Sequence, residues 1–314
     1  MDLTLFPLFA SLVTALVLEA MPFLALGALI SALVEVFAPL DLVERRMPKS
    51  PAAQILLGLT AGMILPTCEC GSVPIVRRFL QKGVPARAAI TYMLAAPVVN
   101  PVVLAATWAA FKGDWTMIAY RVFLVVIPAV AVGLVLGRAA PTELLRFSLA
   151  KGPQALTPLE AQCTSGCDCG CDHGVGPGRN RLFSVLSIAA GEFLETGAFL
   201  VLGACAASLF KVLTPASAVN LFAQNLPLAV AALMLLAIAL TVCSEADAFV
   251  AASFTAFPDA AKAAFTAIGP MVDLKLIALY LLVFRKRVAG AIILVPTVMI
   301  YILAVSLGLF GGRP

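Results

Sequence analysis

The sequence predicts an all-α polytopic membrane protein. Hydrophobic residues make up 62% of its 314 residues and charged residues only 12%, and the mean hydropathy is +1.04. The core of a soluble protein does not accommodate so large an apolar fraction. The apolar stretches have the length of helices rather than of ten-residue alternating strands, which favours a helical bundle over a β-barrel.

Six apolar runs exceed the roughly 20 residues that a membrane-spanning helix needs. They lie near 5–38, 84–110, 115–137, 182–210, 263–284 and 288–310. Two other regions are apolar but interrupted, 52–80 by "PTCECG" and 218–257 by "TVCSEAD". We expect about 8–10 membrane helices, with the two interrupted regions forming broken or re-entrant hairpins. The first run lacks a basic n-region, so we interpret it as a membrane helix rather than a cleaved signal peptide.

Three stretches of the first half recur in the second half in the same order. "LEAMPFLALGAL" at 18–29 aligns without gaps with "LETGAFLVLGAC" at 194–205. "LPTCECGSVP" aligns with "LTVCSEADAF", which pairs Cys68 with Cys243. "AAPVVNP" aligns with "AIGPMVDL", which pairs Asn100 with Asp273. The alignment predicts two membrane repeats.

The predicted boundaries are 1–137 for repeat 1, 138–181 for a hydrophilic linker rich in Gly, Pro and Cys, and 182–314 for repeat 2. Four places hold 15 of the 21 Lys and Arg residues: 41–50, 77–87, the linker and 285–287. The positive-inside rule puts these places in the cytoplasm and both chain termini outside. Each half then makes an odd number of crossings, so the two repeats have inverted topology, as in many secondary transporters.

The two interruptions carry ionisable and thiol side chains at the depth of the hydrocarbon. Backbone can be irregular there only where protein or water surrounds it, and ionisable groups at that depth usually mark a pathway. Thiolates suit soft ions such as Cu(I), Zn(II) or trivalent arsenic. The alternative is that a buried cysteine is simply a small hydrophobe, and we prefer this reading for Cys205. The candidate substrate path comprises Cys68, Glu69, Cys70, Asn100, Cys243, Glu245, Asp247 and Asp273.

Four prolines mark the predicted structural breaks: Pro66, Pro97, Pro101 and Pro270. Carbonyls freed by such prolines can face a cavity, where Asn100 and Asp273 would supply oxygen ligands. Asp273 has an alternative as the ion-pair partner of Lys275 or Arg121. Glu19 and Glu195 are repeat-related acids on the first helix of each half and are candidates for a proton relay. A protonated glutamic acid that only donates a hydrogen bond is the alternative for both.

The linker contains the segment "CTSGCDCGCDHG", which is dense in metal ligands. Its candidate metal ligands are Cys163, Cys167, Cys169, Cys171 and His173, the only histidine of the chain. The spacing does not match a zinc finger or ribbon. A disulfide framework is disfavoured on the cytoplasmic side, where thiols stay reduced. We interpret the segment as a loop that captures or senses soft or borderline metals.

The segment "PTCECGSVPIVRRFLQKGVPARAAITYMLAAPVVNP" at 66–101 resembles the signature region of the predicted permease family typified by the organoarsenical efflux permease ArsP and by YraQ. "CSEADAF" and "GPMVDLK" resemble the second half of the same family. The resemblance implies an inner-membrane permease and, for some members, export of trivalent organoarsenicals through cysteine thiols. By motif, it carries over to Cys68, Cys70, Pro97, Asn100, Pro101, Glu245 and Asp273. The Cys-rich linker leans toward a branch associated with copper and zinc efflux.

Taken together, these features predict a multi-pass permease of the cytoplasmic membrane that exports a soft metal or metalloid, rather than an enzyme. The expected partners are the metal substrate and the lipid bilayer, without nucleic acid and without a tightly bound cofactor. A Zn, Cu or As(III) species would be cargo or linker ligand. No Walker A loop is present, so we expect no ATP drive within the chain. Two alternatives stay open: a membrane thiol-redox protein, and a metal sensor or scaffold without flux.

Overall fold

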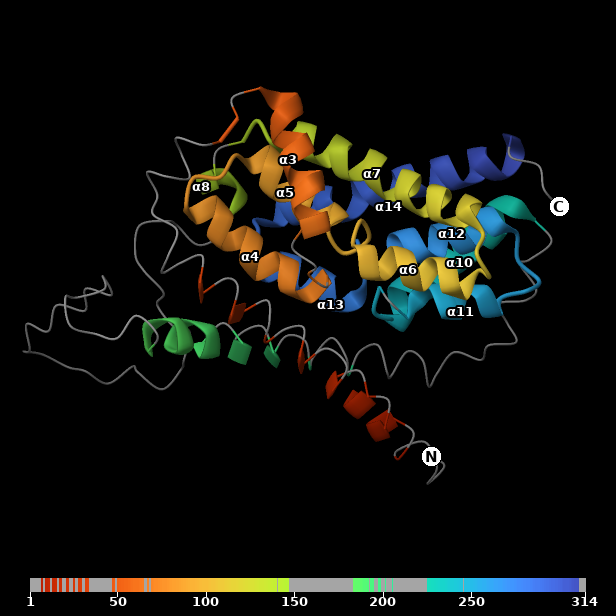
Figure 1. Cartoon of the computed structure of the whole chain (residues 1–314), viewed down its shortest axis with the longest axis horizontal. Helices are drawn as coiled ribbons and strands as arrows, with labels where there is room; N and C mark the ends of the chain where they lie inside the picture. Colours follow the sequence, from red (N-terminus) through yellow and green to blue (C-terminus); the bar gives the residue numbers. More distant parts are fainter. Residues whose placement is uncertain are drawn as a thin grey trace, which may run out of the picture.

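A computed structural model describes residues 47–48, 50–64, 67, 69–139, 141–146, 225–244 and 246–310, with further helical positions within 7–33 and 183–205. Every regular element among these residues is a helix, apart from one antiparallel bridge between Leu145 and Phe284. Figure 1 shows the helices from residues 51–144 and 226–310 packed into one elongated bundle. The prediction of an all-helical membrane protein is confirmed at this level.

The same order of helices occurs on both sides of the linker. The first half contains α3 (Pro51–Ile64), α4 (Glu69–Gln81), α5 (Ala86–Ala95), α6 (Pro101–Ala110) and α7 (Trp115–Leu136). A short helix, α8 (Pro141–Leu144), follows. The second half contains α10 (Leu226–Leu240), α11 (Asp247–Ser253), α12 (Asp259–Ile268), α13 (Leu274–Val283) and α14 (Lys286–Phe310). Each half therefore has two interrupted helix pairs followed by one long helix.

The breaks between α3 and α4 and between α10 and α11 lie where the sequence predicts interruptions. The breaks after α5 and α12 lie inside the apolar runs 84–110 and 263–284, where the sequence marks Pro97, Pro101 and Pro270 as structural breaks. Proline has no N–H and disfavours helical backbone in the residue before it. Pro97 and Pro270 lie in these two breaks.

Side-chain caps restart the helix after each of these additional breaks. Asn100 Oδ1 accepts a hydrogen bond from the backbone N–H of Val102 at 3.0 Å, at the N-terminus of α6. Asp273 Oδ1 accepts one from the backbone N–H of Leu276 at 2.6 Å, at the N-terminus of α13. Both caps satisfy N–H groups that have no partner within the helix. Asn100 and Asp273, which the sequence alignment pairs, thus have the same local role.

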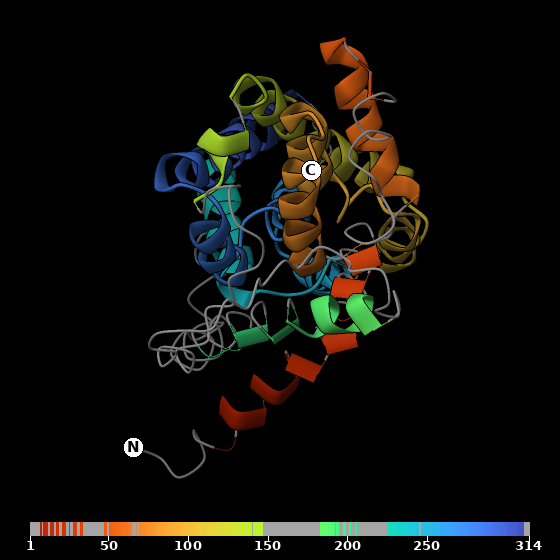
Figure 2. The ribbon, with the colours of Figure 1, turned by 90° about the vertical axis from the view of Figure 1, so that its left-hand side faces the viewer.

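The packing partners of the helices correspond between the two halves. α5 packs against α3, α4 and α7, and α12 packs against α10, α11 and α14. α6 also contacts α7 as α13 contacts α14. Across the boundary, α4 contacts α13, α11 contacts α6, and α7 contacts α14. Figure 2 shows the two halves beside each other when the bundle is viewed from its end.

One end of the bundle gathers basic segments that are far apart in the sequence. The residues after α8 pair with the start of α14: Arg146 N donates to Val283 O, and Arg285 N donates to Leu144 O, each at 3.0 Å. Gly137, at the end of α7, packs directly against the Arg87 side chain near the start of α5. The opposite end has Gly308 of α14 beside Leu226 and Ala260, near the starts of α10 and α12.

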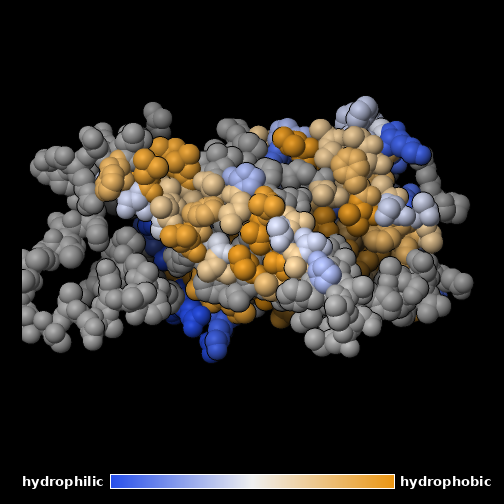
Figure 3. Space-filling model, turned by 90° about the horizontal axis from the view of Figure 1, so that it is seen from below, coloured by the Kyte–Doolittle hydropathy of each residue, from blue (hydrophilic) through white to orange (hydrophobic). Residues whose placement is uncertain are grey.

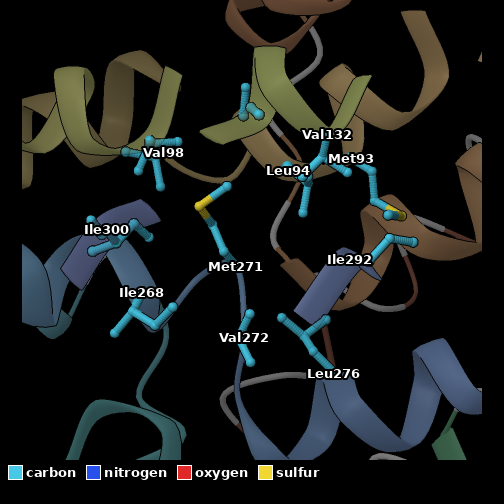
Figure 4. Close-up of a cluster of buried hydrophobic side chains, with 14 of the residues drawn as sticks. Met93, Leu94, Val98, Val132, Ile268, Met271, Val272, Leu276, Ile292 and Ile300 are labelled. Carbon is cyan, nitrogen blue, oxygen red and sulfur yellow. The ribbon is translucent and has the colours of Figure 1, made fainter. Parts of the chain in front are cut away.

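The hydrophobic core is shared between the two halves. In Figure 4, Met271 from the break before α13 lies between Val98 and Leu94 of the first half and Ile268 and Val272 of the second. The outer surface is also largely apolar on the face drawn in Figure 3. Exposed apolar side chains such as Leu235, Leu294 and Leu309 suit contact with lipid. Among the described helices, α7 and α14 are long and apolar enough to cross a membrane, while α3, α6, α10 and α13 are shorter apolar helices.

Candidate functional site

A cluster of buried charged side chains lies where the two halves meet. We call it the junction cluster, and it consists of Glu69, Arg121, Ser244, Asp247, Asp273 and Lys275. Each of these residues is at most 5% exposed. They come from the start of α4, the second turn of α7, the break before α11, the start of α11 and the start of α13. Charges this deeply buried are costly unless they are paired and hydrogen-bonded.

Arg121 holds one side of the junction cluster. Its Nη2 donates to Asp247 Oδ2 at 2.8 Å and to the backbone oxygen of Ser244 at 3.0 Å. Its Nη1 donates to Thr107 Oγ1 at 2.7 Å. The guanidinium group is therefore fixed by α6, by the break before α11 and by α11 itself. Short, charge-assisted hydrogen bonds of this kind are the strong ones.

Lys275 holds the other side through longer contacts. Its Nζ lies 3.5 Å from Glu69 Oε1 and 3.4 Å from Asp273 Oδ2. Glu69 also accepts a hydrogen bond at 3.4 Å from the hydroxyl of Ser244. The two carboxylate oxygens of Glu69 thus contact Ser244 and Lys275 of the second half, which joins the start of α4 to the break before α11 and to α13.

Two thiols lie beside the junction cluster. Cys70 follows Glu69 in α4, and Cys243 precedes Ser244 in the break before α11. They are 3% and 4% exposed, and neither is in a disulfide. Both lie within the electrostatic reach of the Lys275 ammonium group. Within the described part of the chain, no three Cys, His, Asp or Glu side chains converge closely enough to hold a metal ion.

The break before α11 also contains strained backbone. Thr241, at the end of α10, has a positive φ of 49°. This left-handed conformation is uncommon for a β-branched residue and tends to occur at functional sites. The chain therefore accepts local strain where it turns toward Cys243 and Ser244.

Comparison with known proteins identifies the family. The family model described as a predicted permease, ArsP_1, matches residues 6–309. The chain belongs to this permease family. It is 34% identical to the UPF0718 protein YcgR of Bacillus subtilis over 95% of both chains. It is also 36% identical to a Streptococcus mutans protein, over 83% of this chain and 82% of the relative. That relative is named as a candidate subunit of a two-component membrane permease complex. No solved structure matches the chain.

The structure describes six of the eight residues predicted to form the substrate path, all except Cys68 and Glu245. Glu69, Asp247 and Asp273 belong to the junction cluster, and Cys70 and Cys243 flank it. Asn100 caps α6, and Thr67, beside the predicted path, lies 3.0 Å from the hydroxyl of Tyr92. The predicted residues that lie outside the described part of the permease are Cys68, Glu245, Pro66, Glu19, Glu195, Cys163, Cys167, Cys169, Cys171 and His173.

The sequence indicates the two cations of the junction cluster, Arg121 and Lys275, only as alternative partners of Asp273. Lys275 does lie beside Asp273, whereas Arg121 pairs with Asp247 instead. The available signal was that each is the lone basic residue inside an apolar run, Arg121 within 115–137 and Lys275 within 263–284. Ionisable residues inside membrane segments are functional candidates by default, so this signal identifies both Arg121 and Lys275 as candidate site residues.

Proposed function

We propose that the permease is a secondary transporter that exports a soft metal or metalloid species, and that this cargo passes the junction cluster. The observation that carries the proposal is the pair of buried thiols, Cys70 next to Glu69 in the first half and Cys243 next to Ser244 in the second. Thiolates bind soft and borderline cations, and carboxylates neutralise their charge. Buried ionisable groups in a membrane bundle mark such paths.

The arrangement of the helices supports an inverted repeat with re-entrant hairpins. α3 and α5 lie side by side and start at the basic end of the bundle, where Arg87 and Arg285 lie. α10 and α12 start at the opposite end, beside Gly308. The α3–α4 and α10–α11 pairs would then enter the membrane from opposite sides and break near its middle. Transporters with inverted repeats bind their substrates at such breaks.

The acids on the first helix of each half would couple export to protons. Glu19 and Glu195 recur at the same place of the two predicted repeats, and a relay needs an acid on each side of the path. Replacing both by Gln removes the exchangeable protons and should abolish transport driven by a pH gradient. Transport unchanged in Glu19→Gln/Glu195→Gln would remove the relay from the mechanism.

The linker would deliver cargo from the cytoplasm. Its first residues, through Arg146, pack against Val283 and Arg285 at the basic end of the bundle. Thiols of the linker would exchange metal with the thiols beside the junction cluster. Deleting 160–175 should lower flux without abolishing it, whereas a sensor would lose its function entirely. The name of the Streptococcus relative further suggests that the permease works with a second subunit.

The test is uptake into everted membrane vesicles under an imposed proton gradient, with Zn(II), Cu(I), arsenite and methylarsenite as cargo. Vesicles without the permease are the reference. Accumulation of one species above the reference identifies the cargo. No accumulation of any of them, with folded protein present, contradicts export of a soft metal. Thiol trapping during turnover would then test the redox alternative, and metal binding without flux would indicate the sensor.

A further inference from the structure

The two cations of the junction cluster are held very differently. The guanidinium group of Arg121 makes three hydrogen bonds of 2.7–3.0 Å to three separate groups. The ammonium group of Lys275 lies 3.4 and 3.5 Å from two carboxylates, which is longer than a good charge-assisted hydrogen bond. Arg121 is therefore a fixed part of the bundle, and Lys275 is a cation that is positioned but loosely bound.

Acceptor capacity near Lys275 is incompletely used. The junction cluster contains three carboxylates and two cations. Among the described residues, Asp273 Oδ2 has only its 3.4 Å ion-pair contact with Lys275, and Asp247 Oδ1 is buried without a hydrogen-bond partner. A buried acceptor with unused capacity is unfavourable. The carboxylates are thus arranged to receive more positive charge or more ligands than Lys275 supplies in this state.

We propose that the Lys275 ammonium group occupies the cation site of the permease, between Glu69 and Asp273, and that cargo binds by displacing it. The inference rests on the proposed transport function and specifies its substrate class as a thiophilic divalent cation. The ligands would be the carboxylates of Glu69 and Asp273 with the thiolates of Cys70 and Cys243. These donors do not converge in this state, so binding requires the side chain of Lys275 to swing away and the donors to close around the cargo.

A cation tethered to the protein stabilises the buried carboxylates when the transporter holds no cargo. Two buried carboxylates without a counter-charge are strongly unfavourable in the membrane. If the Lys275 ammonium group returns whenever the cargo leaves, the site keeps its positive charge throughout the cycle. Lysine suits this task because its ammonium group is a point charge on a flexible stem, whereas arginine is held by a planar fork of donors.

The binding test uses purified full-length permease in nanodiscs, with Zn(II) as the titrant and Co(II) as the spectroscopic probe. Thiolate–Co(II) charge-transfer absorption reports ligation by the cysteines that remain, and its loss in Cys70→Ser/Cys243→Ser assigns it to these two thiols. The background replaces the linker ligands, by serine at Cys163, Cys167, Cys169 and Cys171 and by alanine at His173. In this background we compare Lys275→Met with the unaltered Lys275 and with Lys262→Met. Lys262 is the matched control, because it pairs with Asp259 at 3.0 Å near the end of the bundle, away from the junction cluster.

Removing the competing ammonium group should tighten Zn(II) binding by about tenfold or more. It should also strengthen the Co(II)–thiolate absorption, and adding Glu69→Gln should reverse both effects. Lys262→Met should bind as the background does. Zn(II) affinity unchanged or weakened in folded Lys275→Met overturns the proposal. Lys275→Gln, which keeps a polar side chain of similar length, provides the same comparison if the methionine variant does not fold.

Vesicle flux separates this inference from the proposed function. If Lys275→Met binds Zn(II) no more tightly while the parent still accumulates cargo in a thiol-dependent way, the displacement of Lys275 by cargo is wrong and the transport proposal stands. If Lys275→Met binds more tightly but no cargo accumulates in parent vesicles, the cation site stands and the transport proposal is wrong. If the displacement proposal and the transport proposal are both correct, Lys275→Met binds cargo more tightly than the parent and its flux falls well below that of the parent.

Discussion

Arg121 and Asp247 form a buried ion pair at 2.8 Å across 126 residues of sequence. The pair joins the long helix of the first half, α7, to the start of α11 in the second half. Its partners Thr107 and Ser244 are also buried, so the guanidinium group has no access to water. The two halves of the permease are therefore joined by a fixed charge pair, with the loosely held Lys275 beside it.

Replacing only Arg121 should destabilise the bundle more than replacing both Arg121 and Asp247. Arg121→Met leaves the Asp247 carboxylate buried without its cation, which costs about 3–5 kcal/mol in comparable pairs. Arg121→Met/Asp247→Leu removes both charges and should recover most of the loss. Thermal unfolding of the detergent-solubilised permease measures the effect. Lys262→Met, which breaks the pair with the exposed Asp259, should change stability by less than about 1 kcal/mol.

The double variant decides this prediction. If Arg121→Met/Asp247→Leu is as unstable as Arg121→Met alone, the loss comes from packing around Arg121 and not from an uncompensated carboxylate. The buried pair would then have no special role in joining the halves.

The contact between α3 and α5 depends on glycine. A Cβ atom at Gly62 would lie 2.7 Å from Ala96 Cα, and one at Gly58 would lie 2.5 Å from Ala88 O. Both obstacles are backbone atoms, so the two helices would have to move apart, and small residues commonly permit such close packing in membranes. Gly62→Ala should cost about 1–3 kcal/mol of stability, as other overpacked sites do.

Gly290 is the matched control for this substitution. It also lies in a helix, α14, but no heavy atom would lie within 4 Å of an added Cβ. Gly290→Ala should be neutral or stabilising by up to about 1 kcal/mol, because alanine favours helix more than glycine does. Equal unfolding temperatures for Gly62→Ala and Gly290→Ala would contradict the close approach of α3 to α5.

Cysteine labelling tests the predicted orientation. Lys286 lies at the basic end of the bundle and Ala256 in the exposed turn between α11 and α12, near the opposite end. With the basic end in the cytoplasm, a membrane-impermeant maleimide should label Ala256→Cys in intact cells and Lys286→Cys only after lysis. The parent gives the background from the native thiols. The reverse pattern would invert the topology, and labelling of both in intact cells would place both ends outside.

Much of the fold follows from local signals in the sequence. Composition and run length predicted the helical membrane bundle, and "PTCECG" and "TVCSEAD" predicted two of the breaks. The breaks within 84–110 and 263–284 are signalled by prolines alone, Pro97 and Pro101 in the first run and Pro270 in the second, because the apolar composition continues across them. Asn100 and Asp273 were selected as path residues. The structure adds that each caps a restarted helix.

The charge pairs of the site could not be predicted from the sequence. Glu69 and Lys275 are 206 residues apart, and nothing local to either indicates the other. Their proximity depends on α4 contacting α13, which is a property of how the two halves pack. The sequence therefore identified the acids and thiols individually, while their arrangement around Arg121 and Lys275 required the structure.

The most direct test of the account measures whether cargo passes the thiols beside the junction cluster. The measurement is the initial rate of cargo uptake into everted vesicles for Cys70→Ser/Cys243→Ser, with Cys205→Ser as the control thiol and with matched protein levels. The account predicts that the double variant falls to the rate of vesicles without permease, while Cys205→Ser keeps the parent rate. A parent rate in Cys70→Ser/Cys243→Ser would contradict it, because cargo would then cross the membrane without these thiols.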